Sequence, residues 1–154
     1  MAPSEPSRAL FFDVFGTCVD WRTSVTQALY AQSHAVLDSA TAPPASTVRR
    51  KARDMTFVHW GEFAQQWRDT YKVFTRTLAT DSGLPFKTVD EHHFDSLKQL
   101  VLDWDLDGLW TSDELYALSM VWHRLEPWAD AARGVELLNS MFGRSWCWSR
   151  VSSI

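Results

Sequence analysis

The segment that decides the fold reads Ala-Leu-Phe-Phe-Asp-Val-Phe-Gly-Thr and occupies residues 9–17. Its residues 9–15 are mostly apolar with little alternation, which is typical of a short strand buried on both faces of a parallel sheet. Asp13 stands near the end of this run, and Gly16 permits a tight turn after it. Because open α/β sheets bind ligands beyond the carboxyl ends of their strands, we expect Asp13 to face a ligand-binding crevice. The alternative is that Asp13 caps the loop and Phe15 packs.

The turn after Asp13 offers further groups to an anionic ligand. We expect the backbone amides of Val14 and Phe15 to donate hydrogen bonds to a substrate anion or an oxyanion. Thr17 adds a hydroxyl within the same turn. Residues 20–22 are expected to close the loop, with Trp21 as a wall of the pocket.

The composition narrows the class of protein. A chain of 154 residues with 45% hydrophobic content can bury a sizeable core. Its net charge is -4, with 15 basic and 19 acidic residues mixed along the chain, so neither nucleic acid nor a membrane surface is an expected partner. Cys18 and Cys147 have no metal-ligand spacing, and we interpret both as reduced thiols. The sequence shows no targeting segment or membrane span, and we expect a cytoplasmic protein.

Apolar residues after the first loop recur at helical spacing. They predict a helix over residues 23–37, capped by Thr23 or Ser24, and a long helix over about residues 47–79. The chain has nine Trp and nine Phe, and several of them form a stripe on the long helix that must pack against another element. The stripe consists of Phe57, Trp60, Ala64, Trp67, Tyr71, Phe74 and Leu78.

Capping boxes and breakers mark the remaining helices. Thr88 with Glu91, and Thr111 with Glu114, predict two helix starts. The predicted inward residues are Phe94, Leu97, Leu100 and Val101 in the first of these helices, and Leu115, Leu118 and Trp122 in the second. After the breaker Glu126-Pro127, a last helix is predicted from Trp128 or Asp130 to about Asn139.

The stretch from Leu10 to Arg22 resembles the first signature of the haloacid dehalogenase (HAD) superfamily, and more narrowly that of the type II (S)-2-haloacid dehalogenases. The resemblance implies that Asp13 is a nucleophile and that Thr17 assists it. Superfamily phosphatases carry a second Asp two positions after the nucleophile, where this chain has Phe15. Because a halide leaves without a proton, displacement at a carbon–halogen bond needs no acid there.

The resemblance also implies a fold. It is an α/β fold, a Rossmann-like core with a helical cap, of which this chain would hold the first core strand and the cap and so be mostly α itself. The implied divisions are residues 1–21 for the first core strand and nucleophile loop, 22–125 for the cap, 126–142 for a return helix, and 143–154 for an aberrant tail.

Residues 67–71 resemble the cap segment whose arginine binds the departing halide and the carboxylate side of the substrate, here Arg68. From the spacing alone, an arginine beside a packed aromatic face, such as Arg68, is more often a surface residue whose stem covers apolar neighbours than an anion ligand. His92 and His93 invite a metal site, but adjacent helix positions point to different faces and no third ligand has matching spacing. We therefore expect no metal and no cofactor, with magnesium needed only by a phosphatase.

The family reaction has a second half, in which water hydrolyses the ester formed on the nucleophile. By the resemblance, this step uses a Ser-Asn pair, a lysine and a later loop, and residues 143–154 match none of them. We therefore expect a C-terminally truncated chain with an incomplete active site, and a frameshift or misread splice junction is our hypothesis for its origin.

Three functions follow as hypotheses. The leading one is a hydrolase that cleaves carbon–halide bonds of short 2-haloalkanoic acids through an aspartyl ester on Asp13. Its partner would be the small-molecule haloacid. Whether the chain forms a homodimer is left open. The alternatives are a HAD-type phosphatase and a non-catalytic helical fragment that acts by interaction.

Overall fold

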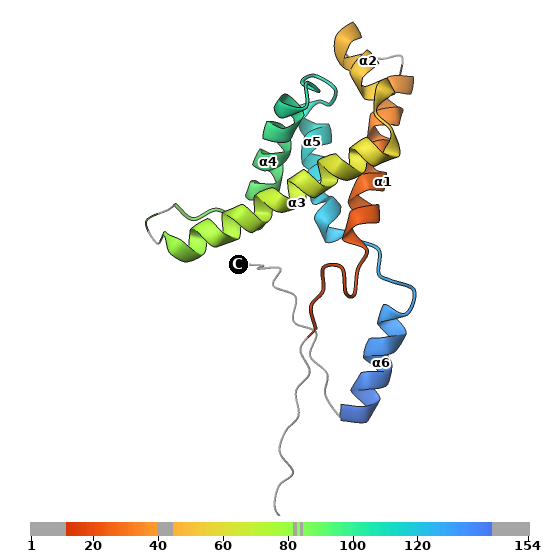
Figure 1. Cartoon of the computed structure of the whole chain (residues 1–154), viewed down its shortest axis with the longest axis vertical. Coiled ribbons are helices and arrows are strands. Elements are labelled where there is room, and N and C mark those ends of the chain that lie inside the picture. Colours follow the sequence, from red (N-terminus) through yellow and green to blue (C-terminus); the bar gives the residue numbers. More distant parts are fainter. Residues whose placement is uncertain (1–11, 40–44, 82, 84, 143–154) are drawn as a thin grey trace, which may run out of the picture. The chain divides into compact units, whose positions relative to one another are not determined.

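The computed structural model describes residues 12–39, 45–81, 83 and 85–142. Their contacts divide them into two units. One, which we call the loop unit, comprises residues 12–21 and 126–142, and the other, the cap unit, comprises residues 22–125. The described part of the chain is mostly helical, as expected, and contains no extended strand (Figure 1).

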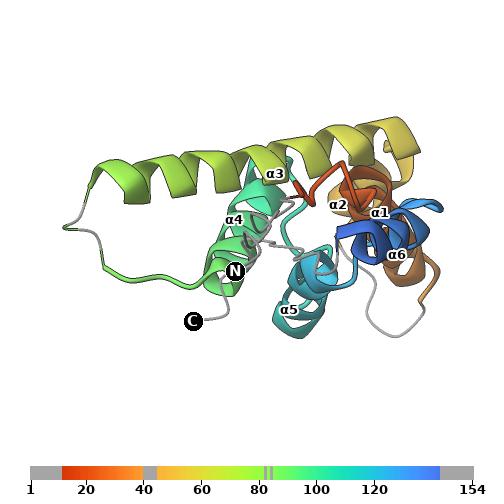
Figure 2. The ribbon, with the colours of Figure 1, turned by 90° about the horizontal axis from the view of Figure 1, so that it is seen from below.

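Helix α1 (Trp21–Asp38) leads into the cap unit. It begins two residues before the expected start, so neither Thr23 nor Ser24 is its cap. The helix crosses α3 closely at Gly61, where an added Cβ would lie 3.8 Å from Thr26 Oγ1 (Figures 1 and 2). An added Cβ at that distance would make ordinary van der Waals contact, so alanine would also fit at this crossing.

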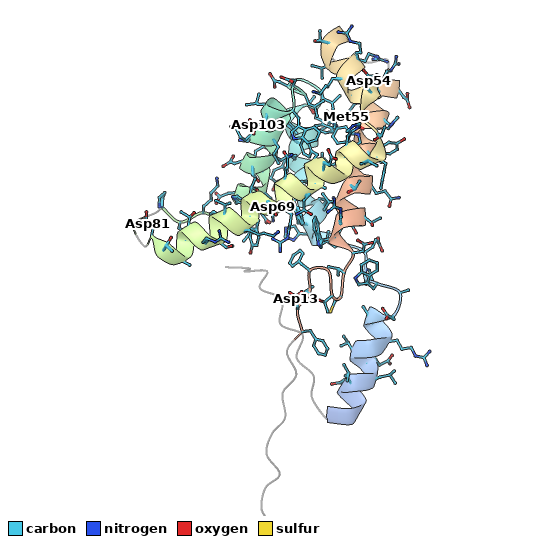
Figure 3. The ribbon with its side chains drawn as sticks, in the orientation of Figure 1. Asp13, Asp54, Met55, Asp69, Asp81 and Asp103 are labelled. Atoms are coloured by element: carbon cyan, nitrogen blue, oxygen red, sulfur yellow. The ribbon has the colours of Figure 1, made fainter. Side chains whose placement is uncertain are left out.

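The single long helix expected over residues 47–79 is wrong. The chain forms two helices there, α2 (Ser46–Asp54) and α3 (Phe57–Thr80). Met55, labelled beside Asp54 in Figure 3, breaks the helix with extended backbone angles (φ -76°, ψ 118°). Its side chain is buried, so the break is held by packing.

The start of α3 explains why periodicity missed this break. Thr56 caps the helix in a box with His59: the Thr56 backbone N–H donates to His59 Nδ1 at 3.0 Å. Capping boxes are recognised in a sequence by glutamate or glutamine three residues after the Ser or Thr. A histidine in that place is not a recognised helix-start signal, so no local pattern marked the break before α3.

The two expected capping boxes at Thr88 and Thr111 are confirmed. The carboxylate of Glu91 accepts the Thr88 backbone N–H at 2.8 Å, and that of Glu114 accepts the Thr111 backbone N–H at 2.7 Å. Each box satisfies amides that the first helical turn leaves without a partner. The elements that follow are α4 (Val89–Asp103), α5 (Ser112–Ser119) and the 3-10 helix η1 (Met120–His123).

An aromatic core joins the helices of the cap unit. Trp60 and Trp67 of α3 are completely buried. The ring of Trp60 lies 5.7 Å from that of Trp110, and the ring of Trp67 lies 5.3 Å from that of Trp122 in η1. The indole N–H of Trp67 also donates to the backbone oxygen of His93 in α4 at 3.1 Å. The predicted stripe is therefore a packing face in its central part.

The ends of the stripe differ from the expectation. Phe57 is 47% exposed and Leu78 is 40% exposed, because the described helices that pack on α3 cover only its middle. Phe94, expected to point inward from α4, is half-buried and lies edge-on against Tyr116 of α5 at 5.6 Å. Leu97, Leu100 and Val101 are buried as predicted.

The loop unit holds the segment expected to be a strand. Residues 9–11 lie outside the described part, and residues 12–14 have no regular structure. Phe15 forms an isolated bridge with Val19, which in turn forms a bridge with Pro127. A strand needs a longer run of paired backbone groups than these bridges supply.

Helix α6 (Ala131–Phe142) starts later than the predicted Trp128 or Asp130. The Trp128 backbone N–H is bound to the oxygen of Cys18, and Gly134 N–H makes the first helical bond to Asp130. Trp128 therefore belongs to the preceding segment. Within the described residues, no helix combines the length and the apolar run that a membrane span requires.

Helix α4 ends in a left-handed turn at Asp105 (φ 54°). The Leu106 N–H donates to the Val101 oxygen at 2.8 Å, and the Asp105 N–H donates to the Leu102 oxygen at 3.0 Å. This is the Schellman pattern, in which glycine usually occupies the left-handed position. Asp105 therefore has a strained, left-handed backbone conformation at the end of the helix.

Replacing Asp105 with glycine is expected to stabilise the cap unit by about 1 kcal/mol, because glycine adopts the left-handed region without the Cβ clash. The Lys51–Asp105 ion pair that is lost spans 3.6 Å between exposed side chains and contributes little. Chemical denaturation measures the change. Asp105→Ala is the control, since it removes the same ion pair but keeps a Cβ; an equal gain in both variants would contradict the strain.

Candidate active site

The turn that follows Asp13 is closed by its own backbone. The oxygen of Val14 accepts the N–H groups of Cys18 at 2.9 Å and Val19 at 3.1 Å. In return, the Gly16 N–H donates to the Val19 oxygen at 3.0 Å. Three hydrogen bonds over six residues thus fix a compact loop directly after the carboxylate.

Gly16 is the residue on which this turn depends. Its φ of +91° lies in a region that L side chains rarely adopt, so glycine is required there. An added Cβ would lie 3.8 Å from Trp21 Nε1, the nearest atom, so conformation decides the choice of glycine. The sequence-based prediction of a tight turn at Gly16 is confirmed.

Asp13 is exposed and pairs with Thr17. The Thr17 hydroxyl donates to Oδ2 of Asp13, which is labelled in Figure 3, at 3.0 Å, so the two residues predicted to act together do lie together. Cys18 is a thiol whose Sγ donates to the Asp13 backbone oxygen at 3.4 Å. A hydroxyl and a thiol from one turn therefore hold both the carboxylate and the backbone of Asp13. The catalytic roles of Asp13 and Thr17 stay predictions.

The amides predicted to bind an anion differ in their surroundings. Val14 uses its oxygen within the turn, and its N–H donates to no other group in the described part of the chain. Phe15 takes part in the bridge to Val19. Trp21 is half-buried and begins α1 directly after the turn. All three residues belong to the loop unit with Asp13, as a pocket wall would, and their binding roles stay predictions.

The loop unit contains a contact that the sequence did not suggest. The indole N–H of Trp128 donates to the Gly16 oxygen at 3.1 Å, and the Trp128 backbone N–H donates to the Cys18 oxygen at 3.0 Å. The Asp20 N–H donates to the Glu126 oxygen at 2.9 Å. The only signal in the sequence was the breaker at Glu126-Pro127, which marks a turn but gives no partner for it.

Arg68 lies on α3 in the cap unit and is half-buried. Its guanidinium carbon lies 5.1 Å from the centre of the Tyr71 ring one turn further on, a cation–π contact. That contact fits the interpretation of Arg68 as a residue whose stem covers apolar neighbours. Halide binding by Arg68 stays a prediction, because Asp13 belongs to the other unit.

His92 and His93 are adjacent on α4 and both buried, with their ring centres 5.8 Å apart. The His92 ring stacks on Phe74 at 4.3 Å, and the His93 ring stacks on Trp122 at 4.8 Å. The two imidazoles are therefore packing elements of the aromatic core. Among the described residues, no three His, Cys, Asp or Glu side chains are grouped to hold a metal ion.

Burial keeps both imidazoles neutral. It lowers the pKa of His92 to about 4, with the charge of Lys87 adding to the effect. It lowers the pKa of His93 to about 3, with the charge of His92 adding to the effect. His93 Nδ1 has no hydrogen-bond partner among the described residues, so a proton there would be buried without one. The core accepts these rings only as neutral groups.

The cap unit has an open hollow of about 550 Å³ between the end of α3 and the start of α4. It is mostly apolar, and its polar side chains already have partners. Lys87 binds Asp95 at 2.7 Å, and the Glu91 carboxylate belongs to the capping box. A substrate site needs polar groups that converge on the ligand. The hollow therefore does not replace the Asp13 turn as the candidate site.

Comparison with solved structures places this geometry in context. The chain is similar to the crystal structure of a defluorinating L-2-haloacid dehalogenase, with a TM-score of 0.64 and 29% sequence identity. The likeness covers 87% of this chain and 47% of that chain. The chain thus spans about half the length of the solved dehalogenase. No protein-family model and no curated protein matches the sequence.

This likeness confirms the expected fold class, a HAD-like chain that is mostly helical because of its cap. It supports the HAD-like family as the one that this chain resembles. The comparison does not identify the residues that carry out chemistry, and the candidates for that role are those of the Asp13 turn.

The neutral histidines make a prediction about pH. The unfolded chain binds protons at these histidines below pH 6.5, whereas the folded chain does not until about pH 4 for His92 and about pH 3 for His93. Stability should therefore fall as the pH is lowered from 6.5, by up to about 1.4 kcal/mol per pH unit for each histidine.

Denaturation of His93→Phe at pH 7.5 and pH 5 tests this. The variant keeps an aromatic ring between Trp122 and Tyr71 and should lose less stability between the two pH values than the natural chain. His34→Phe is the control, because the His34 ring is only partly buried. A loss in His93→Phe as large as in the natural chain would contradict the assignment.

Proposed function

We propose that the chain acts in (S)-2-haloacid dehalogenation, with Asp13 as the nucleophile. The observation that carries the proposal is the exposed Asp13 carboxylate on a closed turn, in a chain 29% identical to a defluorinating L-2-haloacid dehalogenase over 87% of its length. Exposure lets the carboxylate reach a substrate, and the turn limits the directions in which it points. Both are requirements of an in-line displacement.

In the proposed reaction, one carboxylate oxygen of Asp13 attacks the halogen-bearing carbon of the substrate. The carbon–halogen bond breaks, its electron pair leaves with the halide, and an ester links Asp13 to the substrate. The Thr17 hydroxyl, which donates to Asp13 Oδ2, orients the carboxylate for the attack. No proton is needed by the leaving halide, which is compatible with Phe15 in place of an acid.

Water would then attack the carbonyl carbon of this ester and release the 2-hydroxy acid. Formation of the ester is the step that Asp13 and Thr17 support directly, because their hydrogen bond holds the attacking carboxylate. By the resemblance to the family, Arg68 is the residue proposed to bind the departing halide.

Incubating the chain with (S)-2-chloropropionate should add one 1-carboxyethyl group to the Asp13 carboxylate, forming the ester, and release chloride. Mass spectrometry of the peptide that contains Asp13 detects the ester, and an ion electrode follows the halide. Solvent labelled with heavy oxygen distinguishes a hydrolysed ester, since the label enters Asp13 only after hydrolysis. Asp13→Asn should abolish the adduct.

Asp107→Asn is the matched control, because Asp107 is an exposed carboxylate of the cap unit and should leave the adduct unchanged. A 2-fluoropropionate arm asks whether the chain shares the leaving group of the solved dehalogenase. An adduct on several exposed carboxylates at equal rates, or none on Asp13, would overturn the proposal. Turnover of a phosphate ester with magnesium, with no adduct from the haloacid, would favour the phosphatase alternative.

A further inference from the structure

A second segment of the loop unit holds the Asp13 turn from outside. Residues 126–128 bind the turn through three hydrogen bonds, of which Trp128 supplies two: its backbone N–H to the Cys18 oxygen at 3.0 Å and its indole N–H to the Gly16 oxygen at 3.1 Å. More than 100 residues of sequence separate Trp128 from the turn. Trp128 thus binds the loop at two positions, Gly16 and Cys18.

The indole of Trp128 binds Gly16, the residue of the turn with the greatest backbone freedom. Gly16 has φ +91°, and a glycine populates many other backbone states at little cost. Its N–H is held by the Val19 oxygen, and its carbonyl is held by Trp128 Nε1. The two bonds hold the peptide groups on either side of Gly16 and so restrict its backbone to one conformation.

The conformation of Gly16 affects the Asp13 carboxylate through the next residue, Thr17. Thr17 follows Gly16, and the Thr17 hydroxyl donates to Asp13 Oδ2 at 3.0 Å. A rotation of the Gly16 peptide would move the Thr17 hydroxyl and release Oδ2. The side chain of Trp128 remains 42% exposed, so burial of its ring does not account for its place.

We propose that Trp128 is a positioning residue whose indole N–H, through Gly16 and Thr17, sets the direction of the Asp13 carboxylate. The inference rests on the proposed function for its catalytic consequence. Its structural consequence, an ordered turn, can be measured without any activity.

Trp128→Phe tests the inference, because it keeps an aromatic ring and the backbone N–H but lacks the indole N–H. Hydrogen exchange of the Cys18 and Val19 amides, which close the turn, should become roughly three- to tenfold faster, the equivalent of one hydrogen bond. With (S)-2-chloropropionate, the rate of ester formation on Asp13 at saturating substrate should fall about tenfold. The half-saturating concentration and the melting temperature should stay unchanged, which a loss of folding would not produce.

Trp104→Phe is the matched control. The Trp104 indole N–H donates to Gln66 Oε1 at 2.8 Å in the cap unit, so this variant loses one comparable bond from a partly exposed ring. It should change neither the exchange of the turn amides nor the rate of ester formation. Trp128→His restores a ring N–H and should recover part of both effects; it also serves if Trp128→Phe fails to fold.

The outcomes separate the two proposals. Ester formation by the natural chain at a rate equal to that of Trp128→Phe would overturn the inference and leave the proposed function standing. Absence of the ester from the natural chain would overturn the proposed function, and with it the catalytic consequence. Unchanged exchange of the turn amides in Trp128→Phe would overturn the positioning role in either case.

Discussion

The buried indole of Trp67 is the contact on which the cap depends. Complete burial of a side chain of this size removes roughly 200 Å² from water, worth at most about 5 kcal/mol. The indole N–H is satisfied by the backbone oxygen of His93 and by Ser96 Oγ, both at 3.1 Å. Because the ring also lies against Trp122, one side chain joins α3, α4 and η1, and neutral His93 completes the stack.

The sequence predicted the helices well where a local signal marks them. The boxes at Thr88 and Thr111 are local, since the Thr and the Glu lie three residues apart, and both helix starts were right. The break at Met55 was missed, because the residue three positions after the cap Thr56 is His59, which is not a recognised capping-box signal. Helical spacing also did not predict that both His92 and His93 are buried. A crowded aromatic layer can bury two adjacent ring positions of α4, which helical spacing alone does not anticipate.

The candidate site likewise contains residues that a local sequence pattern predicted and one that it did not. Asp13, Gly16 and Thr17 lie within five residues, and their pattern predicted the tight turn that the backbone confirms. Trp128 was missed because its partner Gly16 is distant in the sequence, and a tryptophan after a proline reads as the start of a helix. Arg68 illustrates the opposite limit: its cation–π contact with Tyr71 satisfies a packing role, and a ligand role needs a partner from the other unit.

The two halves of the proposed reaction place different demands on the chain. Attack by Asp13 requires a carboxylate held in one direction, and the groups that hold it, Thr17 and the turn closed by Gly16 and Trp128, all belong to the loop unit. Hydrolysis of the ester requires a water molecule activated for attack on the ester carbonyl, which is a separate demand. The geometry of the nucleophile can therefore be tested by itself, since its hydrogen bonds within residues 12–21 and 126–128 concern only the direction of the carboxylate.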